Sequence, residues 1–191
     1  MEDRALLEFL GKAEKLKCNT RHSWTSSGRH ESVAEHSWRL ALMAYLMKDA
    51  FPDTDIDKVI RMCLIHDLGE AVTGDIPAFE KTRQDEETEN DAVQGLFASL
   101  PEPYCGEIRA LWAEMEERRT PEAKLYKALD KLEALIQHNE ADLSTWLPLE
   151  YDLQMTYGTK ECAFCAYMDH LRETVREDSR RKAGITGATQ K

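Results

Sequence analysis

The sequence lacks long apolar runs. No stretch of about 18 consecutive apolar residues occurs in it, which excludes a membrane-spanning helix. The first residues, Met1 to Arg4, are mostly charged and lack the apolar segment of a signal peptide. These two absences favour a protein that resides in the cytoplasm.

Basic residues are scarce relative to acidic ones. The chain has 25 lysines and arginines against 36 aspartates and glutamates, which gives a formal net charge of −11. A general nucleic-acid binder needs a basic surface to contact phosphates, so no nucleic acid polymer is expected as a partner. A small phosphorylated substrate remains compatible, because one local arginine or a metal ion offsets the negative field.

Cysteines are few and widely spaced. Their number is five, and an odd count at wide spacing favours a reducing compartment over a disulfide framework. Cys162 and Cys165 form a CxxC pair, but no second pair stands at zinc spacing. We therefore interpret them as thiols that face the core.

Strand-like alternation and internal repeats are also missing. Apolar residues instead recur at helical spacing in most of the chain, and Ser32 with Glu35 forms a capping-box pattern at the start of one helix. The sequence predicts an all-α fold, a single helical bundle over residues 1–181 with one core. Residues 182–191 are small and polar and are expected to form a flexible C-terminal tail. The predicted helices cover 5–17, 33–47, 56–67, 83–98, 108–115, 121–136 and 160–180.

The segment from Cys63 to Asp75 places an imidazole and a carboxylate side by side near the end of an apolar helix. His66 and Asp67 are these two residues, and the apolar residues before them would bury one side of the helix. A buried charged aspartate is costly unless it is paired or binds a metal. Adjacent His and Asp ligands suit a hard or borderline divalent cation.

Two further residues strengthen this interpretation. His36 lies on the predicted inner face of the preceding helix, and Asp130 lies beside the apolar stripe of the helix that starts at Thr120-Pro121. A helical bundle directs side chains from separate helices toward one interior point. Taken singly, His36 is more often a hydrogen-bonded core residue and Asp130 a half-solvated one. Together with His66 and Asp67 they favour a metal site with open coordination positions.

The segment from Cys18 to Ser32 is predicted to be a loop. It is rich in Ser, Thr and Gly, yet it carries Arg21 and Trp24. Loops of this composition often carry function. Trp24 either anchors the loop on the core or contacts a ligand, and both alternatives stay open at this point.

The sequence closely resembles the HD-domain metal-dependent phosphohydrolases, and most of all their 5′-deoxynucleotidase branch. The resemblance covers roughly residues 5–170 and rests on ordered motifs in distant segments. These motifs are ESVAEHS at 31–37, HDLGE at 66–70, TGDIP at 73–77 and LDKLE at 129–133.

The resemblance implies roles for individual residues. The metal pattern of the family corresponds to His36, His66, Asp67 and Asp130. Its catalytic acidic residue corresponds to Glu70, and the carboxylate of its TGD motif to Asp75, which would also contact the sugar 3′-hydroxyl. Its substrate-binding Arg and Trp correspond to Arg21 and Trp24, although here two residues separate them, whereas in the bacterial branch they are adjacent. Glu114 is the candidate for a further active-site glutamate.

The expected activity is hydrolysis of deoxynucleoside 5′-monophosphates to deoxynucleosides and phosphate, with a divalent Mn, Co, Mg, Fe or Zn ion as cofactor. Trp24 would exclude a ribose 2′-hydroxyl. The family resemblance also implies a homodimer. One alternative is another phosphohydrolase acting on nucleoside triphosphates or cyclic nucleotides, and few cations near Arg21 speak against a triphosphate. The other is a non-catalytic helical binding module stabilised by a metal.

Overall fold

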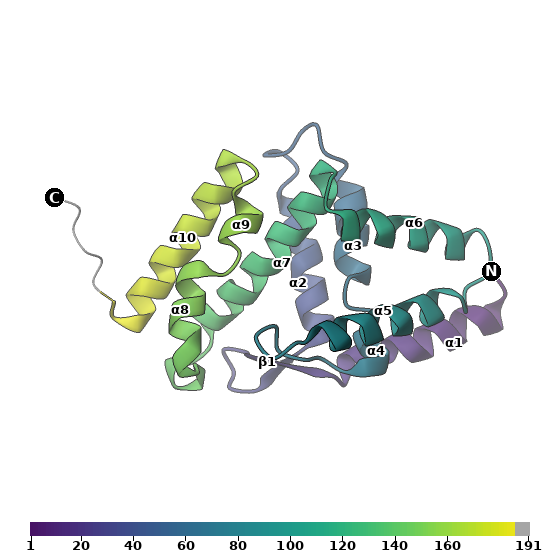
Figure 1. The fold of residues 1–191 in the computed structure, drawn as a ribbon, viewed down its shortest axis with the longest axis horizontal. Coiled ribbons are helices and arrows are strands. Elements are labelled where there is room, and N and C mark those ends of the chain that lie inside the picture. The colour runs from purple at the N-terminus through teal and green to yellow at the C-terminus, as the bar shows by residue number, and fades with distance from the viewer. Residues whose placement is uncertain (186–191) are drawn as a thin grey trace.

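A long central helix, α7, organises the fold, and α2, α3, α6, α9 and α10 pack against it (Figure 1). The computed structural model describes residues 1–185. α2 and α3 pack on α7 in the middle of the molecule, α5 and α6 lie on the side of the N-terminus, and α8 to α10 lie on the opposite side. The α-helices are α1 Asp3–Ala13, α2 Val33–Leu46, α3 Ile56–Ile65, α4 Glu70–Thr73, α5 Arg83–Phe97, α6 Tyr104–Glu117, α7 Pro121–Glu140, α8 Pro148–Thr156, α9 Thr159–Cys162 and α10 Ala166–Ala183; short 3-10 helices cover Glu14–Lys17 and Leu143–Thr145.

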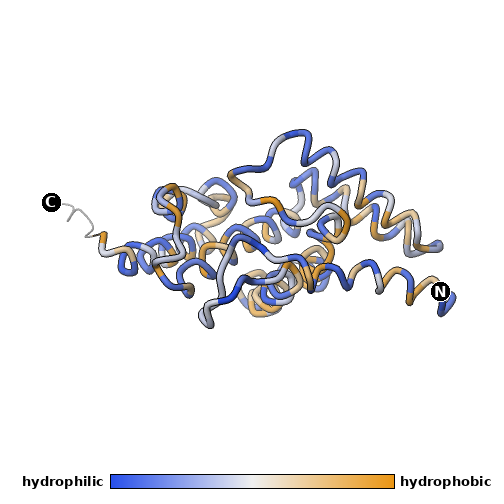
Figure 2. Tube along the Cα trace, turned by 90° about the horizontal axis from the view of Figure 1, so that it is seen from below, coloured by the Kyte–Doolittle hydropathy of each residue, from blue (hydrophilic) through white to orange (hydrophobic). Residues whose placement is uncertain are grey.

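The core forms where α7 meets α2 and α3. Leu125, Leu129 and Leu132 of α7 are fully buried, as the predicted apolar stripe requires. Leu40 of α2 and Met62 of α3 are fully buried against the same cluster. Hydrophobic segments accordingly gather toward the middle of the molecule, whereas α10 is mostly hydrophilic (Figure 2). The all-α prediction is confirmed.

Side-chain caps define where the site-bearing helices begin. Ser32 accepts a hydrogen bond from the Glu35 amide and Glu35 reaches back to the Ser32 amide, which confirms the predicted capping box of α2. Asp55 caps α3, and Thr120 caps α7 directly before Pro121. Such caps stabilise a helix end by about 1 kcal/mol each, so the starting points of α2, α3 and α7 are encoded locally.

The predicted loop at 18–32 is in part a β-hairpin, and the expectation that the chain has no strands is wrong here. β1, Thr20–Trp24, pairs antiparallel with β2, His30–Ser32, and the register shifts between the two ends. The strands are short and polar, so they lack the apolar alternation by which strands are recognised. Gly28 has a φ of 81° in the connecting turn, a conformation that glycine adopts without strain.

The C-terminal region differs from its prediction in two details. The predicted helix 160–180 is interrupted, because α9 ends at Cys162 and α10 begins at Ala166. Tyr167, near the start of α10, is 46% exposed. α10 continues through Ala183, and residues 186–191 of the expected flexible tail lie outside the described residues. Within residues 1–185, no helix combines the length and apolar character needed to cross a membrane.

Candidate metal and active site

Four predicted ligand residues converge in the interior. His36 comes from α2, His66 and Asp67 follow α3, and Asp130 comes from α7. The His66 Nε2 atom lies 3.2 Å from His36 Nε2 and 2.9 Å from Asp67 Oδ2. Asp130 Oδ1 lies 3.3 Å from His36 Nε2 and 3.8 Å from His66 Nε2. The structure therefore brings together the four residues that the sequence singled out.

The hydrogen bond at Nδ1 of each histidine determines whether its Nε2 atom carries a proton or a free lone pair. His66 Nδ1 lies 2.8 Å from the Cys63 carbonyl oxygen, which only accepts, so this nitrogen carries the proton. His36 Nδ1 contacts a carboxylate oxygen of Glu133. In the neutral rings both Nε2 atoms then present lone pairs to each other beside two carboxylates. This donor set fits a divalent cation, which would remove the repulsion between the four groups.

The pKa shifts of the ligand residues follow from the same arrangement. Burial lowers the pKa of His36, as does Arg21, but Glu133 and Asp130 raise it overall to about 9. Burial alone would raise the pKa of Asp67, yet His66, His36 and Arg21 hold it well below its usual range. The pocket between these groups thus favours positive charge.

Glu133 and Arg39 position His36 from behind. Glu133 is fully buried, and its second carboxylate oxygen accepts a hydrogen bond from Arg39 Nε at 2.6 Å. Arg39 also donates to Glu140 at 2.5 Å. A carboxylate on the second nitrogen of a ligand histidine fixes its tautomer and ring orientation. The role of Glu133 was not foreseen, although its spacing of three residues from Asp130 puts both on one face of α7.

Replacing Glu133 by glutamine is expected to lower metal affinity about 10- to 100-fold, the usual cost of losing such an outer contact. The glutamine amide is nearly isosteric but no longer provides a charged acceptor for His36 Nδ1. Isothermal titration with Mn²⁺ measures the affinity. Glu140→Gln, which removes a partner of Arg39 without touching His36, is the matched control. Equal affinities in the two variants would contradict the positioning role.

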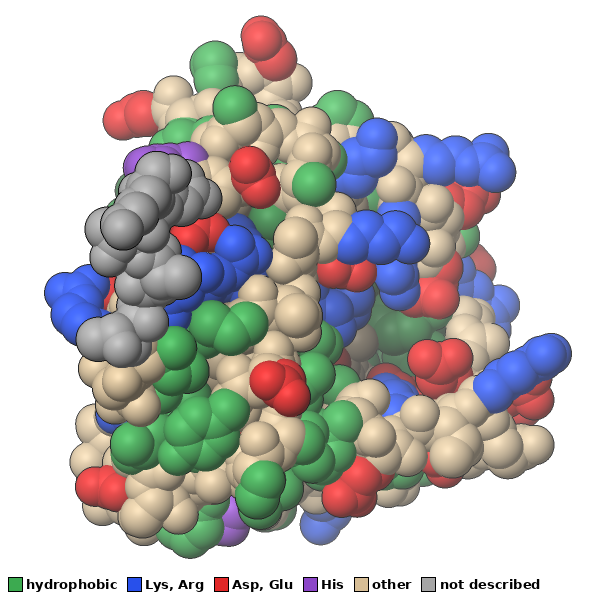
Figure 3. Space-filling view, turned by 60° about the vertical axis from the view of Figure 1, so that its left-hand side comes forward, with side chains coloured by type: hydrophobic (Ala, Val, Ile, Leu, Met, Phe, Trp, Pro, Cys, Tyr) green, Lys and Arg blue, Asp and Glu red, His purple; other side chains and the backbone are tan. Residues whose placement is uncertain are grey.

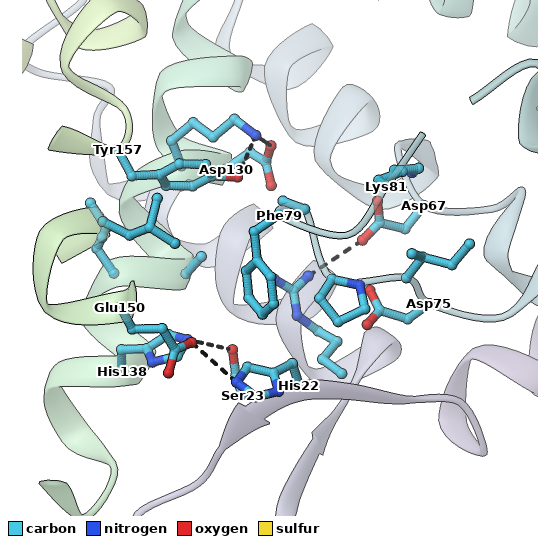
Figure 4. A pocket seen from close by; sticks show the side chains of 18 of the residues that line it. His22, Ser23, Asp67, Asp75, Phe79, Lys81, Asp130, His138, Glu150 and Tyr157 are labelled. Carbon is cyan, nitrogen blue, oxygen red and sulfur yellow. Dashed lines mark hydrogen bonds and ion pairs between the residues drawn. The ribbon is translucent and has the colours of Figure 1, made fainter. Parts of the chain in front are cut away.

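A cavity of about 530 Å³ opens beside these ligands. Asp67 and Asp75 lie on one side of it, His138 and Glu150 on the opposite side, and Phe79 between them (Figure 4). Acidic and basic side chains border a hollow on the face of the molecule drawn in Figure 3. The polar side chains that line the cavity are Arg21, His22, Ser23, Asp67, Glu70, Asp75, Lys81, Glu86, Arg118, Lys127, Asp130, Lys131, His138, Glu150, Gln154, Tyr157 and Glu161.

Glu70 and Asp75 enter the cavity from the turn after the ligand pair. Gly69 permits this turn, because a Cβ atom there would lie 3.0 Å from the Glu89 carbonyl oxygen of α5. Burial, with the charges of Asp67 and Asp75, raises the pKa of Glu70 to about 10. Burial also raises the pKa of Asp75. The Glu70 Oε2 atom is buried and has no hydrogen-bond partner among residues 1–185, which leaves it available to a reacting group.

Basic side chains are more numerous in the cavity than the sequence suggested. Arg21 lies 3.6 Å from Asp67, and Lys127 donates to Asp130 at 2.8 Å. Lys131, one helical turn after Lys127, donates to Tyr157 at 2.6 Å, and Lys81 also lines the wall. The expectation that few cations lie near Arg21 is therefore wrong. The i, i+4 spacing of Lys127 and Lys131 was the signal that would have revealed them.

Two predicted site residues lie elsewhere. Trp24 is not among the cavity-lining residues; its ring stacks on His30 with centroids 4.0 Å apart. Glu114 is likewise not a lining residue and instead pairs with Lys58 at 2.8 Å. Its other contact is a hydrogen bond from Thr120, the cap of α7. These contacts support structural roles for both side chains.

Replacing Trp24 by alanine is accordingly expected to lower the free energy of unfolding by about 1–2 kcal/mol, since a partly buried ring is lost from the hairpin. The ratio of kcat/KM for deoxy- and ribonucleotides should remain at its wild-type value. Thermal unfolding and parallel kinetics on dCMP and CMP measure both quantities. A smaller dCMP-to-CMP ratio of kcat/KM, with an unchanged free energy of unfolding, would instead indicate that Trp24 contacts the substrate.

A helical bundle with a buried His, His-Asp, Asp ligand group is the arrangement of an HD domain, and comparisons with known proteins agree. Residues 13–172 match the HD domain family. The human 5′-deoxynucleotidase HDDC2 is 37% identical over 145 residues, which cover 72% of this chain and 68% of that protein. Hdd1 of Schizosaccharomyces pombe, also named a 5′-deoxynucleotidase, is 29% identical over 160 residues, covering 74% and 80% of the two chains. The chain belongs to the HD domain family.

A solved structure supports the same assignment. The crystal structure of a protein described as "Predicted metal-dependent phosphohydrolase" from Magnetospirillum magnetotacticum superposes with a TM-score of 0.80 at 31% identity. The alignment covers 94% of this chain and 93% of that one. The HD-type fold expected from the resemblance is thus confirmed.

Proposed function

We propose that this protein hydrolyses deoxynucleoside 5′-monophosphates to deoxynucleosides and phosphate. The observation that carries the proposal is the convergence of His36, His66, Asp67 and Asp130 on one point beside a cavity lined by Glu70. The relatives named 5′-deoxynucleotidase support the substrate class. The small-molecule size of the cavity agrees with a mononucleotide.

The four ligand residues would hold a divalent metal ion, and the mixture of imidazole and carboxylate is compatible with Mn, Co, Mg, Fe or Zn. When bound, such an ion lowers the pKa of water and polarises a phosphoryl oxygen. The protein side chains supply the remaining steps. They bind the phosphate, orient the sugar and transfer one proton.

Arg21, Lys127 and Lys131 provide the positive charge for the phosphate. Arg21 offers a planar fork of N–H donors, and the two lysines add point charges from α7. Glu70 Oε2 would take a proton from the attacking water as the water oxygen bonds to phosphorus. The bond from phosphorus to O5′ breaks, and the same proton then passes to O5′ of the leaving deoxynucleoside. Asp75 would accept a hydrogen bond from the sugar 3′-hydroxyl. Glu114 has no part in this scheme.

A screen of the reaction products by anion-exchange chromatography tests the proposal directly, because it detects phosphate, polyphosphate and nucleoside monophosphates alike. The wild-type protein is incubated with Mn²⁺ and each of four classes: deoxynucleoside monophosphates, ribonucleoside monophosphates, deoxynucleoside triphosphates and cyclic nucleotides. Fastest phosphate release from the deoxynucleoside monophosphates is expected. Hydrolysis of triphosphates is a specific rival, because five basic residues line the cavity. Preferred release of polyphosphate from the triphosphates would contradict the proposal. No turnover in any class would favour a binding module.

We also propose that the protein forms a homodimer through α2. The face of α2 opposite His36 is apolar and exposed: Trp38, Tyr45 and Leu46 are 64%, 62% and 65% exposed, and Leu42 lies between them on the same face. An apolar stripe of this kind on a helix typically packs against another surface. A second copy of the chain presents the same stripe, as an isologous interface requires.

Replacing Trp38 by glutamate is expected to convert a dimer into a monomer, because it places a charge within the apolar stripe. Light scattering after size exclusion measures the halved mass. Arg83→Glu, at an exposed position of α5, is the control and should leave the mass unchanged. A monomeric wild-type protein would refute the interface.

Two further proposals concern the cellular location of the protein and its binding of nucleic acid polymers. All five cysteines are free thiols, which supports a reducing compartment such as the cytoplasm as our proposed location. The net charge of −11 supports the proposal that nucleic acid polymers are not substrates. A salt-dependent binding assay with single-stranded DNA tests the second point.

A further inference from the structure

The cavity wall away from the ligand group carries a polar cluster that the proposed catalysis does not use. The cluster consists of His22 and Ser23 from β1, His138 from α7 and Glu150 from α8. Glu150 Oε1 lies 3.1 Å from His22 Nε2 and 3.4 Å from His138 Nε2, and Ser23 Oγ lies 3.4 Å from His138 Nε2. Figure 4 shows these side chains gathered opposite Asp67 and Asp75.

Part of the hydrogen-bonding capacity of this cluster is unused. Glu150 Oε2 accepts a hydrogen bond from the Leu147 amide at 2.6 Å, which caps α8, but Oε1 has no such bond. His22 Nε2 is buried and forms no hydrogen bond within residues 1–185, despite its 3.1 Å distance from Oε1. Buried polar groups are normally paired. An unsatisfied nitrogen, His22 Nε2, therefore lies beside the carboxylate oxygen Glu150 Oε1 in the wall of the cavity.

Two other roles for the cluster are less well supported. Among the described residues, the groups whose ligand atoms converge closely enough for a metal involve His36, and the cluster around Glu150 is not one of them. A simple ion pair between Glu150 and His138 is disfavoured, because burial lowers the pKa of His138 and keeps the ring neutral. The cap of α8 needs only Oε2 and leaves the position of Oε1 unexplained.

The position of the cluster matches the far end of a nucleotide. His138 lies eight positions after Asp130 along α7, which corresponds to about 12 Å of helix. A mononucleotide with its phosphate at Asp130 would therefore extend its base toward His138. Phe79 stands next to this point, with its ring edge-on to His22 at 5.5 Å between centroids, and offers an aromatic surface to a base.

We infer that Glu150 and His22 read the edge of the base, with Glu150 Oε1 accepting from an exocyclic amino group and His22 Nε2–H donating to the adjacent ring nitrogen. This inference rests on the proposed function and specifies its substrate. Cytosine and adenine carry an amino donor next to a ring-nitrogen acceptor, and this pattern complements the pair. Uracil and hypoxanthine carry a carbonyl oxygen at the same position, which would face the carboxylate. The enzyme therefore prefers amino-bearing bases over their oxo counterparts.

The test compares substrates that differ at this one position. Wild-type kcat/KM is expected to be higher for dCMP than for dUMP and higher for dAMP than for dIMP. Glu150→Gln keeps an oxygen for the Leu147 amide but adds an N–H2 donor, so both ratios should narrow by about tenfold or more. Asp152→Asn, an exposed carboxylate two residues further along α8, is the control and should leave both ratios unchanged.

Binding measurements separate this inference from the proposed function. Isothermal titration of dCMP and dUMP is performed with EDTA present, so that no turnover is needed. Tighter binding of dCMP, lost in Glu150→Gln, supports base reading even if the protein hydrolyses neither nucleotide. Equal affinities for dCMP and dUMP in the wild type, or an equal decrease for both in the variant together with a lower melting temperature, would reduce Glu150 to a helix cap and overturn the inference.

Discussion

Replacing Asp130 by asparagine is expected to remove both metal binding and turnover. Asp130 supplies one of two carboxylates beside two facing imidazole nitrogens, and Lys127 already neutralises part of its charge. Without it, Asp67 is the only carboxylate left in the ligand group to balance the charge of a divalent ion, while the positive charge of Lys127 remains nearby. Metal affinity should therefore fall by more than the 10- to 100-fold that is typical when a residue supporting a ligand, but not itself a ligand, is replaced.

The measurement combines metal content by mass spectrometry with phosphate release from a deoxynucleoside monophosphate. Asparagine preserves the shape of Asp130, so the helical content should stay at the wild-type level and can be checked by circular dichroism. Asp91→Asn, on the exposed side of α5, controls for the loss of a negative charge. Full metal occupancy with full turnover would remove Asp130 from the ligand set.

Replacing Glu70 by alanine should leave the metal in place while kcat falls by roughly 10²–10⁴, the usual contribution of a general acid or base. Glu70 lines the cavity but does not belong to the His36, His66 and Asp67 group. Burial and the charges of Asp67 and Asp75 raise its pKa, and a divalent cation at the ligand group would oppose this rise and favour the carboxylate form that accepts a proton.

Metal content and single-turnover kinetics of Glu70→Ala distinguish two roles. Normal metal content with slow chemistry assigns Glu70 to proton transfer, whereas loss of the metal would make Glu70 a ligand. Glu80→Ala, in the exposed segment before α5, is the control and should show wild-type kinetics.

Locally encoded features were predictable from the sequence. The capping box of Ser32 and Glu35 and the proline at the start of α7 each depend on residues within one turn. The four ligand residues were found because ordered motifs and helical faces agree over long separations. The family comparison confirms the family and the fold, and the ligand role itself remains a proposal.

Features that depend on long-range contacts were not predictable. The β1–β2 hairpin has a polar surface, so its strands carry no periodic apolar signal. Trp24 turns toward His30 through the local geometry of that hairpin, and Glu114 is drawn to Lys58 on another helix. Glu150 reaches the cavity from α8, a segment whose sequence gave no regular pattern, and no motif marks it.

Helix α7 links the separate parts of the site in one rigid element. Lys127, Asp130, Lys131 and His138 all line the cavity from this helix, and Glu133 supports His36 from it. A single inserted residue would rotate everything beyond it by about 100° and shift it by about 1.5 Å. Point substitutions can therefore change the side chains at the base end of this wall without moving the ligand residues. An insertion, in contrast, displaces one end of the wall relative to the other. Since His22 and Glu150 belong to β1 and α8, α7 sets the distance between the ligand group and the base end of the cavity, and the base preference itself depends on the elements that pack beside it.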